Sequence, residues 1–161
     1  MYVAMGRSGQ PSHMGSDDMS LSTKALVWFV VVFHGAIFLT EVFFWMQPGV
    51  HGIALQRLGG PFGIDAYTQA SILKATFINL GFYNLFLAAA GLAGLTFMSR
   101  SEVAIGRTLI LYMCLSAVGA GIVLLFSTSA YIGALLQALP AAAALGLMVR
   151  ADPIRNQSAV T

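Results

Sequence analysis

Four long apolar segments constrain this 161-residue chain more than any other feature, and they run over residues 25–46, 72–98, 105–126 and 130–149. About 20 helical residues at 1.5 Å each cross the ~30 Å hydrocarbon layer of a bilayer. Backbone groups in lipid must be hydrogen-bonded within the protein, and the segments lack the alternation of a barrel strand. The sequence therefore predicts an all-α polytopic membrane protein, built as a bundle of four transmembrane helices.

The composition excludes several other classes of protein. Hydrophobic residues make up 58% of the chain and charged residues 9%, against about 25% charged residues in a typical soluble domain. The formal net charge is only +2 and basic residues flank the apolar segments, so we expect no nucleic-acid partner. Cys114 is the single cysteine, and His34 is the one histidine inside an apolar segment. We therefore expect no disulfide, no metal site and no bound cofactor.

The distribution of basic residues predicts an orientation in the membrane. The loop over residues 47–70 and the start of the next segment hold Arg57 and Lys74. The other six basic residues fall on the side of the amino terminus: Arg7, Lys24, Arg100, Arg107, Arg150 and Arg155. Because cytoplasmic loops carry the excess of Lys and Arg, we expect a multi-pass protein of the cell (inner) membrane with both termini in the cytoplasm.

The chain divides into three parts on this interpretation. Residues 1–23 form a polar tail without hydrophobic periodicity, for which we expect disorder. In this tail the run Ser-His-Met-Gly-Ser at 12–16 resembles a cloning remnant, and Met19 is an alternative start. The transmembrane domain covers residues 24–150 with its outer loop at 47–70, where 51–58 are expected to form a short helix. Residues 151–161 are a short polar tail.

The first apolar segment carries His34 and Glu41, two helical turns apart and on one face with Trp45. Seven residues separate His34 and Glu41 by about 10.5 Å along the axis, so a group from another helix, water or a ligand is expected between them. An acidic residue at the centre of a membrane helix costs roughly 2.5–3.5 kcal/mol. Either neighbouring helices satisfy these groups and they do nothing else, or they mark a functional site.

Polar residues in two other segments extend this set. Asn79, Tyr83 and Asn84 lie in the second segment. Because neighbouring helices run antiparallel, we expect Asn79 at the depth of Glu41 and Asn84 at the depth of His34. The fourth segment adds Gln137, and we expect His34, Glu41, Asn79 and Gln137 to converge on one enclosed volume. The alternative is interhelical packing, since such polar contacts average only about 0.6 kcal/mol each.

The spacing of these residues resembles a known family. The motifs are His34-x6-Glu41-x3-Trp45, Asn79-x-Gly81-Phe82-Tyr83-Asn84 and Gln137-x-x-Pro140-Ala141. They are similar to small bacterial membrane proteins of domain-of-unknown-function family 1304, over about residues 20–149. The chain departs from the family pattern at Leu80, where Gln is usual, and at Leu85, where Gly is usual. The resemblance implies a four-helix membrane fold and importance for His34, Glu41, Asn79, Tyr83, Asn84 and Gln137, and it brings no established activity.

Two functions of different kinds remain open. The first is an intramembrane polar pocket that binds or transforms a small lipophilic molecule, with His34 and Glu41 as candidate acid and base. Its ligand-binding residues are predicted to be His34, Glu41, Trp45, Asn79, Tyr83, Asn84 and Gln137. The second is a non-catalytic accessory subunit of a larger membrane complex, which has a membrane-protein partner or forms a homo-oligomer. Membrane lipids are expected partners in both cases, and the sequence leaves open whether the protein is an enzyme.

Overall fold

The computed structural model describes residues 19–60, 63–100 and 102–151. Of the tail at 1–23 for which we expected disorder, residues 1–18 lie outside the described residues, and 21–23 are helical. The described chain is all-α. Its elements are α1 (Leu21–Phe43), α2 (Pro48–Leu58), α3 (Ala66–Ser99), α4 (Val103–Ser127) and α5 (Tyr131–Arg150).

Four of these helices, α1, α3, α4 and α5, are long and apolar enough to cross a membrane. Their outward faces carry large apolar side chains such as Trp28, Phe86 and Leu115, which are about half exposed or more. Such an apolar surface is unfavourable in water and is favourable in a bilayer, where lipid chains surround it. The predicted four-helix membrane bundle is therefore confirmed.

Residues at the helix starts determine where three of the helices begin. The side chain of Ser20 accepts a hydrogen bond from the Thr23 amide, so α1 begins four residues before its expected start at residue 25. Asp65 caps α3 in the same way, and hydrogen bonds from the Thr68 hydroxyl and amide hold the pKa of Asp65 below its ordinary value. The loop helix α2 begins at Pro48 and not at residue 51, since proline suits the first helical turn.

The four long helices form two antiparallel pairs, α1 with α3 and α4 with α5, and glycines bring the members of each pair together. A Cβ atom at Gly81 of α3 would lie 2.7 Å from Val42 Cγ2 of α1. One at Gly121 of α4 would lie 2.9 Å from the Ala134 carbonyl oxygen of α5. Small residues at such positions let helix backbones approach closely in a membrane.

The two pairs meet in the half of the bundle where α1 begins and α5 ends, which we call the terminal half. A Cβ atom at Gly94 of α3 would lie 2.9 Å from the Gly106 carbonyl oxygen of α4. Arg107 of α4 donates a 2.8 Å hydrogen bond to the Met148 carbonyl near the end of α5. The main core lies here and includes Val27, Val30, Val31, Ile110, Met113, Cys114, Ala117, Ala144 and Met148.

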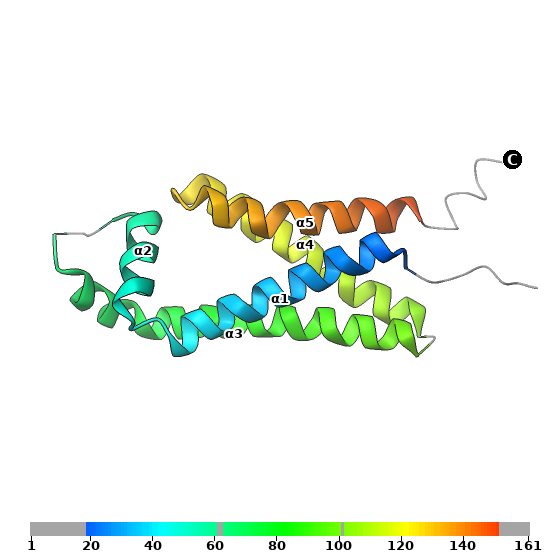
Figure 1. Ribbon diagram of the computed structural model, residues 1–161, viewed down its shortest axis with the longest axis horizontal. Helices are drawn as coiled ribbons and strands as arrows, with labels where there is room; N and C mark the ends of the chain where they lie inside the picture. The colour runs from blue at the N-terminus through cyan, green and yellow to red at the C-terminus, as the bar shows by residue number, and fades with distance from the viewer. Residues whose placement is uncertain (1–18, 61–62, 101, 152–161) are drawn as a thin grey trace, which may run out of the picture.

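The opposite half, which we call the α2 half, is covered by α2. Figure 1 shows α2 lying across the direction of the long helices, at the end opposite to the last turn of α5. One end of α2 follows directly from α1, and its other end is held by Ser129 of the α4–α5 turn. The Ser129 amide and hydroxyl both donate to the Arg57 carbonyl, at 2.9 and 2.8 Å. The short helix therefore spans from one helix pair to the other.

Candidate functional site

A cavity of about 640 Å³ lies in the α2 half, with walls from both helix pairs and from α2. Most of its wall is apolar, and Phe33, Ile37 and Leu87 form the part nearest the terminal half. Seven of the lining residues have a side chain with a polar atom: Thr40, Glu41, Trp45, Arg57, Tyr83, Asn84 and Gln137. Five of the seven predicted ligand-binding residues thus lie on one cavity, and His34 and Asn79 do not.

The exposed lining residues of the long helices lie on α3 and α4, from which we infer that the cavity opens between these two helices. Leu80 and Tyr83 of α3 line it and are also exposed, at 41% and 58% of their surface. Ala120 of α4 lines it and is exposed as well. Because α3 and α4 are both candidate membrane spans, this opening faces the region that lipid occupies.

Glu41 and Asn84 form a hydrogen-bonded pair across the α1–α3 interface. The Asn84 side-chain amide donates to Glu41 Oε2 at 3.0 Å and to the Leu80 carbonyl at 3.1 Å. These bonds use both N–H groups of the amide. Glu41 Oε1 and Asn84 Oδ1 have no hydrogen-bond partner in the described part of the chain. Both residues also line the cavity.

The expected depths of Asn79 and Asn84 are wrong. Asn84, and not Asn79, meets Glu41, and Asn79 lies on an exposed face of α3 outside the cavity wall. The expectation from the sequence aligned α1 and α3 at the midpoints of their apolar segments. Their register is instead set where Gly81 approaches Glu41 and Val42, and α3 is displaced from the expected register by five residues, or about 7.5 Å.

His34 does not line the cavity, although Phe33 and Ile37 of the same helix do, and its side chain is fully buried. Its Nδ1 donates a 2.8 Å hydrogen bond to the Val30 carbonyl. A carbonyl only accepts, so in the neutral ring the proton stays on Nδ1 and Nε2 is a bare acceptor. Nε2 has no hydrogen-bond partner among the described residues. The expected convergence of His34 with Glu41 on one volume is therefore wrong, although both share one face of α1.

Trp45 lines the cavity and also holds its α2 end together. Its indole N–H donates a 2.9 Å hydrogen bond to the Ala70 carbonyl of α3, and its ring stacks on Phe77 at a centroid distance of 3.6 Å. The Trp45 carbonyl accepts a 3.2 Å hydrogen bond from His51 of α2. With its one polar side-chain atom used in this way, Trp45 presents only an apolar ring surface to the cavity.

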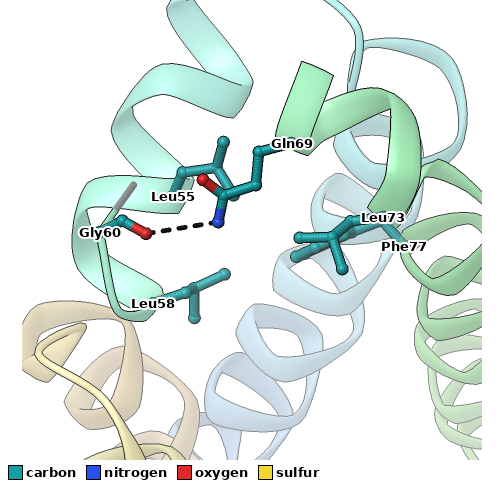
Figure 2. Close-up of a pocket in the computed structure, with 6 residues that line it drawn as sticks. All are labelled: Leu55, Leu58, Gly60, Gln69, Leu73 and Phe77. Atoms are coloured by element: carbon teal, nitrogen blue, oxygen red, sulfur yellow. Dashed lines mark hydrogen bonds between the residues drawn. The ribbon is translucent and has the colours of Figure 1, made fainter. Parts of the chain in front are cut away.

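A second, smaller cavity of about 170 Å³ lies between α2 and the start of α3 (Figure 2). The Gln69 side-chain amide donates a 3.3 Å hydrogen bond across it to the Gly60 carbonyl. Leu58 and Phe77 line both cavities, so the smaller one lies behind the α2-side wall of the larger. Its other lining residues are Leu55, Gly60, Gln69 and Leu73.

Sequence reasoning missed the contribution of α2 and of Arg57. Arg57 stands in the last turn of α2 and lines the cavity. It was counted only as one of two basic residues on the predicted outer side. The position of this isolated basic residue within the predicted short helix at 51–58 was the available signal. In the described ranges, no group of three or more His, Cys, Asp or Glu side chains is placed to hold a metal ion.

Four membrane-spanning helices, with a cavity that opens between two of them, define a small multi-pass membrane protein. The chain belongs to the family described as protein of unknown function (DUF1304), whose model matches residues 28–149. The membership suggested by the sequence motifs is thereby confirmed. No curated protein and no solved structure matches the chain.

Proposed function

We propose that the cavity in the α2 half binds a small lipophilic molecule that enters from the membrane. The observation that carries this proposal is the cavity itself, which has apolar walls and the Glu41–Asn84 pair in one of them. Its volume of about 640 Å³ falls in the range of small-molecule sites, which measure about 300–1,000 Å³ and have few polar groups.

The free oxygens of Glu41 and Asn84 support a ligand with its own hydrogen-bonding group. An amide oxygen accepts, and a carboxyl group accepts or, when protonated, donates. A hydroxyl on the ligand donates to either oxygen, and an ester oxygen accepts from Glu41 when that carboxyl group is protonated. In surroundings of low dielectric, an unsatisfied polar group is costly, so a matching ligand gains from both partners. An aliphatic molecule without a polar group leaves them unmatched.

Binding is the function we propose in preference to chemical transformation. Of the two candidate acid and base groups, Glu41 lines the cavity and His34 does not. A ligand in contact with Glu41 is therefore not in contact with both groups at once. The role of a non-catalytic accessory subunit is the alternative, and it is the interpretation left if the cavity binds nothing.

Filling the cavity tests the proposal directly. A Cβ atom at Gly133 of α5 meets only Leu124 Cδ2, at 3.9 Å, so a Gly133→Leu side chain extends into the cavity without a clash. Gly146→Leu on the same helix is the matched control, because Gly146 is exposed and a Cβ atom there meets nothing within 4 Å.

The readout is fluorescence of Trp45 in a Trp28→Phe background, since Trp28 and Trp45 are the two tryptophans. The probe is a monoacylglycerol with a dibrominated acyl chain, added to protein in nanodiscs, because bromine quenches indole on contact. We expect saturable quenching that weakens about ten-fold or more in Gly133→Leu and is unchanged in Gly146→Leu. Equal quenching in both variants would show simple partitioning into the bilayer and would overturn the proposal.

A further inference from the structure

We propose that the ligand of this cavity is a single-chain lipid with an anionic phosphate head group, which Arg57 holds at the rim. This inference rests on the proposed function and names the class of molecule. It assigns to Arg57 a binding role beside the Glu41–Asn84 pair.

The first argument is the position of the Arg57 side chain. Its backbone carbonyl is fixed by two hydrogen bonds from Ser129, so the α2 end and the α4–α5 turn hold this residue in place. The side chain is exposed and also lines the cavity. Its guanidinium has no ion-pair or hydrogen-bond partner within the described residues. A guanidinium with free donors on a backbone held in place suits phosphate, which it binds through two parallel hydrogen bonds.

The second argument is the order of groups along the cavity. Arg57 lies on α2, which covers the open end of the bundle, and Glu41 with Asn84 lies further in. Beyond them the wall toward Phe33 and Leu87 is apolar. From Glu41 to Phe33 the lined part of α1 extends over eight residues, or about 12 Å. An anionic head, a hydroxyl or ester, and then a hydrocarbon chain follow in the same order in a lysophospholipid.

The third argument limits the ligand to one acyl chain. The cavity has the volume of a small-ligand site, about 640 Å³. Its opening lies between α3 and α4, where lipid chains approach. One acyl chain of the ligand in the cavity packs against the apolar part of its wall.

Two probes that differ only in the phosphate test the inference. They are the dibrominated monoacylglycerol described above and the lysophosphatidic acid with the same acyl chain. The measured quantity is the ratio of their affinities, from quenching of Trp45 in the Trp28→Phe background. The variants are Arg57→Gln, which removes the charge, and Lys74→Gln as the matched control. Among the described residues, Lys74 is the other basic residue in the α2 half; it is exposed and does not line the cavity.

We expect the wild-type protein to bind the phosphate-bearing probe about ten-fold more tightly, because one charge-assisted contact contributes a difference of this size. Arg57→Gln should remove this preference, so that the two probes bind with equal affinity, and Lys74→Gln should keep it. If Arg57→Gln and Lys74→Gln lose the preference for the phosphate-bearing probe equally, the probe is attracted to a basic surface of the protein in general, and the inference is overturned. Equal affinity of the wild type for the two probes overturns the inference alone. Binding of neither probe overturns the proposed function as well.

Discussion

The two halves of the bundle use the same four helices and differ in how the helix pairs meet. In the terminal half, glycines at the α3–α4 interface bring backbones within van der Waals reach, and the core there is filled. In the α2 half, close glycine contacts are found within each pair, at Gly81 and Gly121. The space between the pairs holds the cavity. The comparison shows that the position of a few small residues decides which half is solid and which half is hollow.

The largest expected effect concerns Trp45, which ties α1, α2 and α3 together in the hollow half. Trp45→Ala removes the stacking on Phe77 and the hydrogen bond to Ala70. We expect it to lower the free energy of unfolding by about 3 kcal/mol, the lower end for a buried tryptophan. Circular dichroism during unfolding in sodium dodecyl sulfate measures this loss.

Trp45→Phe is the control for this substitution. It keeps an aromatic ring against Phe77 and removes only the indole N–H, so we expect a loss of about 1 kcal/mol. If Trp45→Ala and Trp45→Phe cost the same, stacking contributes nothing and the hydrogen bond alone holds this end of the molecule.

The next effect compares the two halves directly through glycine substitutions. At Gly94 a Cβ atom would lie 2.7 Å from Ile110 Cγ1 and 2.9 Å from the Gly106 carbonyl oxygen. Gly94→Leu should therefore lower the free energy of unfolding by about 3 kcal/mol, the upper end for overpacking. Gly133→Leu, in the hollow half, meets open space and should cost less than about 1 kcal/mol. Equal losses in the same unfolding assay would show that the two halves are equally filled.

The smallest effect is expected at Glu41. Glu41→Gln keeps an oxygen that accepts from Asn84, and polar contacts in membrane bundles average only about 0.6 kcal/mol. We therefore expect the free energy of unfolding to change by less than about 1 kcal/mol. A loss of several kcal/mol would mean that Glu41 is ionised and paired with a cation, and infrared spectroscopy of the carboxyl group would then detect the carboxylate.

The sequence predicted the four membrane helices because each span is long, apolar and nearly free of charge. It also predicted most of the polar residues on the cavity wall, since membrane segments contain few such residues. The register of α1 against α3 was not predictable from helix midpoints, because Gly81 sets it through one close contact. The role of Arg57 was hidden because no periodic pattern shows that α2 lies across the bundle. The burial of His34 outside the cavity wall depends on the same packing.

The attachment of α2 at both of its ends has a consequence for how affinity is measured. At one end His51 bonds to the Trp45 carbonyl, and at the other Ser129 bonds to the Arg57 carbonyl. A helix held in this way is not a hinged cover, so on the proposed function a ligand exchanges through the side of the cavity between α3 and α4. The relevant concentration of a ligand is then its mole fraction in the bilayer. Adding lipid at constant total ligand should lower occupancy by dilution, even when the volume of buffer is unchanged.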